Sequence, residues 1–527
     1  MMHFGRFRIL AAGAALAAVL AANPALSATP ADTLVQAWAI DDTITLDPAE
    51  SFELSPAEFI GNAYDMLVRL DINDTSKVVP GVAESWTVSD DGLTYTFKLK
   101  KDIKFASGNP ITSADVAYSF ERAVRLDKSP AFILTQFGLT KDNINEKAKA
   151  VDDNTFVFTV DKPYAPSFVL NCLTATVAAV VDKKLLEEHA EKVTPTDEYK
   201  YDTDYANAWL KTKSAGSGPF VIREWRANEV VILERNDNFY GEKAKLKRVF
   251  YRHVKESATQ RLMLESGDVD VARNLEPGDY EAVQKNDKLA TTSAAKGTVY
   301  YISLNQKNEN LAKPEVREAF KYLVDYDAIG STLIKGIGEI RQTYQAKGVL
   351  GSLDAAPYKL DVAKAKELLA KAGYANGFDV EILTYVLPAY SAAVQSYLGA
   401  VGIRAKISQL QTQAVIDRVW RGESQLNMGS WGSYSINDVA AIMPVYFGGT
   451  PDDYSRDPEV QKLIADAGRT NDEAKRKEFY SAAIKKITEN AYWMPLHTYV
   501  STYAMSKQLK MNTYPDEMHR YYEATWV

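Results

Sequence analysis

A regular alternation of predicted helices and strands over residues 361–429 constrains the fold more than any other feature. Asp361 caps a predicted helix with one apolar face, and Gly373 follows its last residues, as a helix C-terminus favours. Predicted strands at 378–385, 403–410 and 426–429 alternate with predicted helices at 389–400 and 412–421. This spacing is that of βαβ units, so we expect a largely parallel sheet covered by helices.

The part of the chain before residue 361 has a different pattern of predicted elements, with hairpins as well as helices. Residues 85–99 alternate apolar and polar side chains about a turn at Asp91-Gly92, which predicts a β-hairpin, and residues 148–160 predict a second one. Between them, Thr112 has the position of a capping residue for a helix over 112–125. A chain of 527 residues predicts about three folding units. No long linker separates them, so we expect lobes that close about a short hinge.

The N-terminus has the pattern of a secretory signal peptide over residues 1–28. A basic start with Arg6 and Arg8 precedes an apolar run over 9–22 and small residues around Ala28, after which we expect cleavage. The alternative is a membrane anchor, but a run of about 14 residues is shorter than the ~20 that span a bilayer. We therefore expect a periplasmic mature protein that is not anchored in the membrane.

Composition and motifs argue against several classes of function. A net charge of −8 does not fit a nucleic-acid binder. The single cysteine, Cys172, excludes an internal disulfide, and we interpret it as a small buried apolar side chain. The five histidines lack the spacing of metal ligands, and no motif of a hydrolase or a phosphate-binding loop occurs. We expect no metal, no cofactor and no catalysis; a secreted hydrolase is the alternative from a different class.

Five segments, in the right order, are similar to signatures of one family. They are Leu46-Asp47-Pro48, residues 80–86 (PGVAESW), residues 89–122, residues 216–220 (GSGPF), and Asn305 with residues 314–319 (PEVREA). The chain therefore resembles the family 5 solute-binding proteins of ABC transporters, the dipeptide-, oligopeptide- and nickel-binding group. Turn and cap chemistry accounts for most of these residues, so the signatures mainly describe a fold.

The resemblance implies an α/β, two-lobed periplasmic binding protein fold (class II, cluster C-like), with an extra domain in the first lobe and a hinge between the lobes. The first lobe would combine residues 29–75, 200–290 and the C-terminal return 500–527, with the added domain at 76–199. The second lobe would be residues 291–499. The implied partners are a small-molecule or peptide ligand and an ABC permease in the inner membrane, and we expect a monomer.

Candidate ligand contacts follow from the resemblance. Family members contact ligand just after Leu-Asp-Pro, which implies Phe52 and Leu54. Their main contact lies in a Trp-x-x-Asp-Tyr segment, where the aspartate pairs with a peptide's α-amino group. Here the segment reads Trp431, Gly432, Ser433, Tyr434 and Ser435, with Tyr434 in the place of the aspartate and Asp438 as the next acid. A buried ammonium needs a counter-charge, so binding of free peptide N-termini is in doubt.

Three further positions carry two interpretations each. Arg341 either faces the cleft and pairs with a carboxylate or phosphate, or is a solvated surface arginine. Trp431 stacks on the ligand or packs in the core, and Phe132 lies where the added domain approaches the cleft or belongs to the core. Di- and oligopeptides are the family's usual ligands. The missing aspartate also favours an opine, a modified peptide, an oligosaccharide or a metal chelate.

Overall fold

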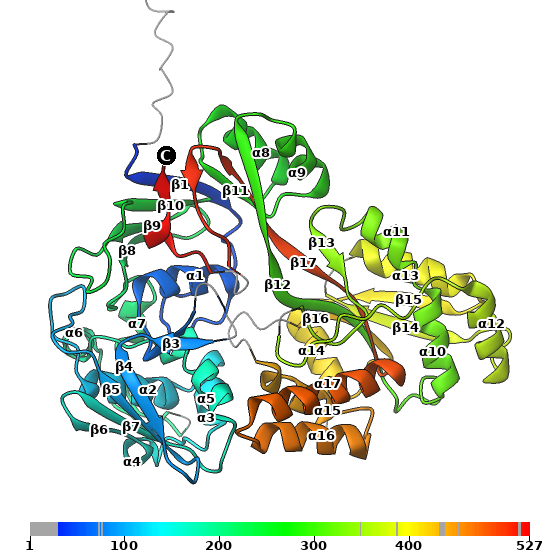
Figure 1. The fold of residues 1–527 in the computed structure, drawn as a ribbon, viewed down its shortest axis with the longest axis horizontal. Helices are drawn as coiled ribbons and strands as arrows, with labels where there is room; N and C mark the ends of the chain where they lie inside the picture. Colours follow the sequence, from blue (N-terminus) through cyan, green and yellow to red (C-terminus); the bar gives the residue numbers. More distant parts are fainter. Residues whose placement is uncertain are drawn as a thin grey trace, which may run out of the picture.

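The computed structural model describes residues 30–71, 74, 77–197, 199–347, 349–385, 388–431, 438–450, 453–514 and 518–527. The predicted signal peptide lies outside this part of the chain. Figure 1 shows two α/β lobes side by side, joined by two long strands that run from one lobe into the other. No helix among the described residues is long and apolar enough to cross a membrane.

One sheet extends through both lobes. Its strands are β1 (Thr33–Trp38), β8 (Phe220–Arg226), β9 (Val230–Arg235), β10 (Arg248–His253), β11 (Val271–Arg273), β12 (Leu289–Leu304), β13 (Gly338–Ile340), β14 (Asp379–Thr384), β15 (Arg404–Gln409), β16 (Leu426–Trp431) and β17 (Trp493–Ser506). Within the described ranges the order is β15-β14-β16-β12-β17-β11-β1-β10-β9-β8, and β13 pairs with β17. The central strands β12 and β17 therefore belong to both lobes.

The pairing of the two long strands is irregular where they pass between the lobes. Strands β12 and β17 pair antiparallel, and, besides a shift between Tyr300 and Tyr301, their register shifts between Ala295 and Val299. Residues before the shift pair with 500–506, beside the first-lobe strand β11, and residues after it pair with 493–498, beside the second-lobe strand β16. A few residues at an element boundary can absorb a large backbone rotation. This irregularity is where we expect the hinge.

In the first lobe, β1 pairs in parallel with β10 and β11. Its other elements are α1 (Leu54–Ala63), α7 (Asn207–Leu210), α8 (Ser257–Ser266), α9 (Pro277–Gln284), η4 (Tyr521–Glu523), β2 (Val68–Leu70), β18 (Leu509–Lys510) and β19 (Thr525–Trp526). Strand β3 (Val78–Pro80) follows the expected boundary at 75 and pairs with β2. Gly218 packs against the end of α1, where a Cβ would lie 2.7 Å from the Asn62 carbonyl oxygen. The glycines of the 216–220 segment thus allow a close backbone approach.

The added domain is built on a four-stranded antiparallel sheet in the order β4-β5-β7-β6. Its elements are β4 (Ala83–Val88), β5 (Thr94–Leu99), β6 (Ala148–Asp152), β7 (Thr155–Thr159), α2 (Ser113–Leu126), η1 (Ser129–Ala131), α3 (Phe132–Thr135), α4 (Ile144–Lys147), α5 (Pro166–Cys172), η2 (Thr176–Ala178) and α6 (Lys183–His189). Both predicted hairpins are confirmed, and so is the helix with its capping box between Thr112 and Asp115. One hydrophobic cluster runs from this sheet into the first lobe.

The second lobe contains the alternating segment. Its helices are α10 (Pro314–Leu323), α11 (Tyr326–Ser331), α12 (Val362–Lys371), α13 (Pro388–Gly399), α14 (Thr412–Trp420), η3 (Val439–Ala441), α15 (Met443–Phe447), α16 (Pro458–Arg469) and α17 (Glu473–Glu489). The predicted parallel pairing is confirmed for β14 with β15 and with β16. The return strand β12 lies antiparallel to β16, so this part of the sheet is mixed.

The signature residues of the second lobe have structural roles. The Asn305 amide donates hydrogen bonds to the carbonyl oxygens of Gly422 (3.1 Å) and Ser424 (2.7 Å), which fixes the turn before β16. Arg317 donates to the Asn490 carbonyl at 3.2 Å, and Lys321, which follows the signature, donates to the Thr488 carbonyl at 2.6 Å. The Arg317 cation at the C-terminal end of α17 compensates the negative end of the helix dipole.

A buried histidine makes the second lobe sensitive to acid. His497 on β17 is stacked between the rings of Tyr300 and Tyr390, with centroids 4.8 and 4.6 Å away, and neither ring nitrogen has a hydrogen-bond partner in the described part of the chain. Desolvation lowers the pKa of His497 from 6.5 to about 3. The unfolded chain therefore binds a proton below pH 6.5 that the folded chain does not.

We expect His497 to reduce the free energy of unfolding as the pH falls from 6.5 towards 3, and to have no such effect above 6.5. At about pH 4.5 the loss is roughly 3 kcal/mol, at about 1.4 kcal/mol per pH unit. In His497→Phe, which keeps a ring between the two tyrosines, this component of the acid sensitivity should disappear. Denaturant unfolding of both proteins at a series of pH values measures the difference. Equal pH slopes would contradict the assignment.

Candidate functional site

The loop that precedes α1 is fixed by a buried ion pair between two of the sequence signatures. Asp47 accepts hydrogen bonds from the Arg122 guanidinium at 2.7 and 2.5 Å, from the Asn207 amide at 2.7 Å and from the Ala49 N–H at 2.9 Å. Asp47 and Arg122 are both almost completely buried. The ion pair therefore ties the loop at 47–53 to helix α2 of the added domain and sets where the chain enters α1.

Two of the predicted ligand contacts lie together at this loop. Phe52 and Phe132 pack edge to face with ring centroids 5.7 Å apart, although they are 80 positions apart in the sequence. Phe132 is 46% exposed, so the interpretation as a core residue is wrong. Leu54 is the first residue of α1 and is half-buried. The first lobe thus presents an aromatic pair beside the start of α1, suited to an apolar part of a ligand.

The second-lobe segment is only partly within the described residues. Strand β16 reaches Trp431, whose backbone pairs with Val299 directly after the register shift in β12. Strand β16 therefore ends next to the expected hinge. Gly432, Ser433 and Tyr434 lie outside the described residues, and so does the side chain of Trp431. Their predicted contacts stay predictions.

Asp438 is engaged in a buried ion pair within the second lobe. Its carboxylate accepts hydrogen bonds from both terminal nitrogens of Arg476, at 2.8 and 2.7 Å, and from the Ala440 N–H at 2.8 Å. Asp438 is 3% exposed. Arg476 on α17 also donates to the Ser167 hydroxyl of α5, in the added domain, at 3.2 Å. This ion pair therefore lies where the second lobe touches the first.

A second contact between the lobes lies nearby. The Ala165 N–H donates to the Gly468 carbonyl oxygen at 3.3 Å. Arg476 also lines a cavity of about 300 Å³ and a larger one of about 720 Å³, and residues of both lobes line each. The contact between the lobes at Arg476 is therefore bordered by open space.

Arg341 does not have the surroundings of a surface residue. Its guanidinium donates to the Asp354 carboxylate at 2.9 Å, to the Thr343 hydroxyl at 3.1 Å and to the carbonyl oxygens of Gln345 (3.0 Å) and Leu353 (2.7 Å). It is 5% exposed, so the interpretation as a solvated surface arginine is wrong. These internal partners fold the loop at 341–354 back on itself.

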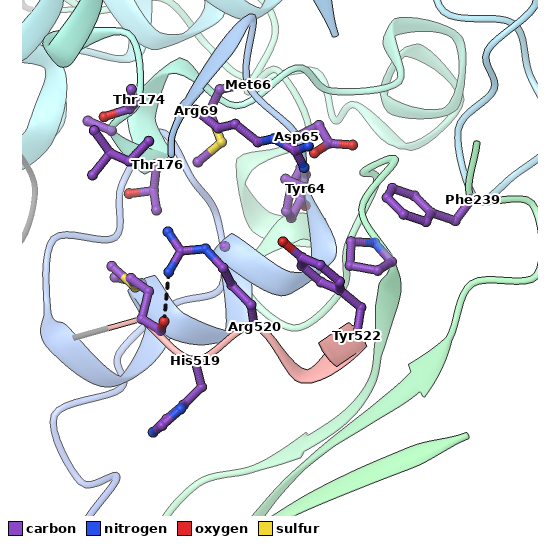
Figure 2. A pocket seen from close by; sticks show the side chains of 16 residues that line it. Tyr64, Asp65, Met66, Arg69, Thr174, Thr176, Phe239, His519, Arg520 and Tyr522 are labelled. Carbon is purple, nitrogen blue, oxygen red and sulfur yellow. Dashed lines mark hydrogen bonds between the residues drawn. The ribbon is translucent and has the colours of Figure 1, made fainter. Parts of the chain in front are cut away.

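The first lobe has a cavity of about 110 Å³ on one face of α1. Ala57 and Gly61 line it and lie one and two turns after Leu54, so the three residues share a face of the helix. Figure 2 shows the Arg69 and Arg520 side chains on opposite sides of this cavity, with the Tyr522 hydroxyl directed into it. Among the described residues, no cluster of His, Cys, Asp and Glu that could hold a metal ion occurs.

Sequence analysis missed Ser167, Arg476, Arg69 and Arg520. Arg476 stands in a run of charged residues that predicts a solvated helix face, and the other three carry no motif. Their positions depend on contacts between segments 300 to 450 residues apart along the chain. Such contacts leave no local signal in a single sequence.

The chain was compared with known proteins. Residues 77–453 match the model of the bacterial extracellular solute-binding proteins, family 5 Middle. The probable D,D-dipeptide-binding periplasmic protein DdpA of Escherichia coli K12 is 30% identical over 510 residues, which cover 94% of each chain. The glutathione-binding protein GsiB of the same strain is 26% identical over 88% of this chain and 89% of GsiB.

The fold also matches solved structures. The periplasmic binding protein DppA of Helicobacter pylori, in complex with the peptide STSA, superposes with a TM-score of 0.76 at 26% identity. The match covers 94% of this chain and 98% of that protein. The expected two-lobed periplasmic binding protein fold is thereby confirmed.

Proposed function

We infer the function of this protein from one premise: the chain belongs to the bacterial extracellular solute-binding proteins, family 5. It is the solute-binding component of an ABC importer, which holds a small polar solute between two lobes and delivers it to a membrane permease. The observation that carries this conclusion is the pair of long strands, β12 and β17, that runs through both lobes and shifts register between Ala295 and Val299, where the strands pass from one lobe to the other. A ligand that touches both lobes favours the closed state because it binds that state better.

The ligand we propose is a peptide or a peptide-like solute. The named ligands of the three relatives described above, a D,D-dipeptide, glutathione and a tetrapeptide, support this class. On the first lobe, Phe52, Phe132 and Leu54 would contact the ligand. On the second lobe, the segment from Trp431 to Tyr434 would do so. An opine, an oligosaccharide or a metal chelate is the second candidate class, favoured by the neutral Tyr434 at the family's amine-binding position.

We propose further that a free α-amino group contributes little to affinity. Asp438 already neutralises Arg476, and drawing it towards a ligand ammonium would leave that arginine buried without a counter-charge. Arg341 and Asp438 would therefore support the site rather than contact the ligand.

We also propose domain boundaries at 75, 199, 290 and 499, a monomeric state and cleavage of the signal peptide after Ala28. N-terminal sequencing of the periplasmic protein tests the cleavage site.

Calorimetry on paired peptides tests the ligand class. D-alanyl-D-alanine, glutathione and Ser-Thr-Ser-Ala would each be titrated with a free and with an acetylated N-terminus. We expect at least one pair to bind, with acetylation changing the dissociation constant by less than about threefold. Removal of one partner of a desolvated charge pair costs about 2–5 kcal/mol, so an amine-binding acid would produce a loss of roughly 30-fold or more.

A loss of that size on acetylation would contradict the role assigned to Asp438 and Tyr434. Binding of oligosaccharides or metal chelates in place of every peptide would favour the second ligand class. Mass spectrometry of the recovered ligand completes the test, because a binding protein returns it unchanged and a hydrolase does not.

A further inference from the structure

The cavity beside α1 on the first lobe has an unusual charge balance. Its walls come from α1, from β2, from residues 174–176 of the added domain and from the C-terminal residues 518–522. Arg69 of β2 and Arg520 of the C-terminal segment are the two cations that line it, and Asp65 is the one acid. The cavity therefore combines segments from both ends of the chain around two guanidinium groups, as Figure 2 shows.

The acid in the wall is already engaged. The Asp65 carboxylate accepts a hydrogen bond from the Tyr240 hydroxyl at 2.8 Å, and the residue is 8% exposed. Burial raises the pKa of Asp65, so its negative charge is disfavoured. Arg69 is exposed and forms no ion pair within 4 Å with any residue that the structure describes. His519, which also lines the cavity, has its pKa held well below 6.5 by burial and by Arg273, so it adds no charge.

The remaining polar groups are mostly hydrogen-bond donors. Among its contacts, Arg520 donates a hydrogen bond to the Met518 carbonyl at 3.1 Å, and its guanidinium lies 4.5 Å from the Tyr514 ring centroid. Burial raises the pKa of Tyr522, which keeps the hydroxyl protonated and able to donate. Two planar guanidinium groups and a phenol hydroxyl are donors of the kind that a carboxylate binds, because its two oxygens accept hydrogen bonds in pairs.

Helix α1 connects the cavity with the predicted ligand contacts of the first lobe. Ala57 and Gly61, which line the cavity, share the face of α1 that begins at Leu54, and the loop before α1 carries Phe52. A Cβ built on Gly61 meets only the Met518 sulfur, at 4.0 Å, so the absence of a side chain there keeps the cavity open. A volume of about 110 Å³ suits one small group of a ligand rather than a whole peptide.

We propose that this cavity is a carboxylate subsite, in which Arg69 and Arg520 hold an anionic group of the solute. The subsite rests on the proposed function and refines it, because it selects peptide-like solutes that carry a carboxylate. Recognition would then depend on the acidic end of the ligand, where the family's usual recognition of the ammonium is lost with Tyr434.

Calorimetry with matched free-acid and C-terminal amide forms of Ser-Thr-Ser-Ala, glutathione and D-alanyl-D-alanine tests the proposal. We expect the wild-type protein to bind the acid at least tenfold more tightly than the amide. In Arg69→Gln this preference should fall below about threefold, through weaker binding of the acid alone. Gly61→Leu, which fills the cavity without changing its charge, should also weaken binding of the acid, whereas Gly61→Ala should not. The control is Arg223→Gln, an exposed first-lobe arginine outside the cavity, which should behave as the wild type.

Other outcomes of the calorimetry would contradict the subsite alone, or the subsite together with the proposed function. Equal binding of acid and amide by the wild type, or an acid preference that survives in both Arg69→Gln and Gly61→Leu, overturns the subsite and leaves the proposed function standing. Binding of oligosaccharides or chelates with no peptide bound in either form overturns both. Matching thermal midpoints of the variants and the wild type exclude misfolding as the cause of a loss.

Discussion

Asp47→Asn is expected to reduce the free energy of unfolding of the first lobe by about 3–5 kcal/mol, because it leaves the buried Arg122 guanidinium without a counter-charge. Arg122 is 1% exposed and its remaining acceptor is the Tyr205 carbonyl at 2.8 Å, so water cannot replace the lost carboxylate. The same substitution loosens the loop that carries Phe52, and ligand affinity should fall with stability. Denaturant unfolding, monitored by intrinsic fluorescence, measures the change.

Two controls show whether charge burial is the cause. Glu367→Gln breaks an exposed ion pair with Lys364. The Glu367 side chain is 68% exposed and that of Lys364 is 38% exposed, so the loss should cost less than about 1 kcal/mol. The double variant Asp47→Leu with Arg122→Met removes both charges and should lose less stability than Asp47→Asn alone. A single variant within about 1 kcal/mol of the wild type would contradict the role given to the ion pair.

Arg476→Met is expected to have an effect of similar size in the second lobe. It leaves the Asp438 carboxylate buried with the Ala440 N–H as its one remaining donor among the residues that the structure describes, which costs about 3–5 kcal/mol. It also removes the hydrogen bond from Arg476 to Ser167, so the closed state should lose part of its advantage. Denaturant unfolding reports the first effect, and peptide affinity measured by calorimetry reports the second.

Ser167→Ala separates these two effects. It removes the hydrogen bond between the lobes and leaves the ion pair of Asp438 intact, so the free energy of unfolding should change little. The hydrogen bond is worth about 1 kcal/mol, which corresponds to roughly a fivefold weaker affinity if the contact belongs to the closed state. An unchanged affinity in both variants would show that this contact does not bear on closure.

Local patterns were sufficient to predict most elements. The hairpin at 85–99, the capped helix that begins after Thr112 and the parallel strands β14 and β15 depend on side chains close in the sequence. Cys172 is buried, as expected for a small apolar residue. Propensity, caps and periodicity act over a few residues, so a single sequence contains them.

The parts that could not be predicted join distant segments. The hinge irregularity appears only when β12 pairs with β17, about 200 residues later. The sequence predicts Phe52 near the cleft and Phe132 either near the cleft or in the core, but nothing in it shows that their rings meet. Arg341 was assigned to the cleft or the surface, because the loop that buries it depends on Asp354 and Leu353 folding back onto it.

The most direct test of the account is the distance between the lobes with and without a bound peptide. Cysteines introduced at Lys149 on β6 and Lys366 on α12, both exposed, would carry spin labels. Cys172 is buried and its thiol pKa is raised by burial, so it should stay unlabelled. We predict that the tightest-binding peptide of the calorimetric panel shifts the label distances to a shorter, narrower distribution that saturates at one peptide per protein. The same distance distribution with and without saturating peptide would contradict closure of two lobes about the β12–β17 hinge.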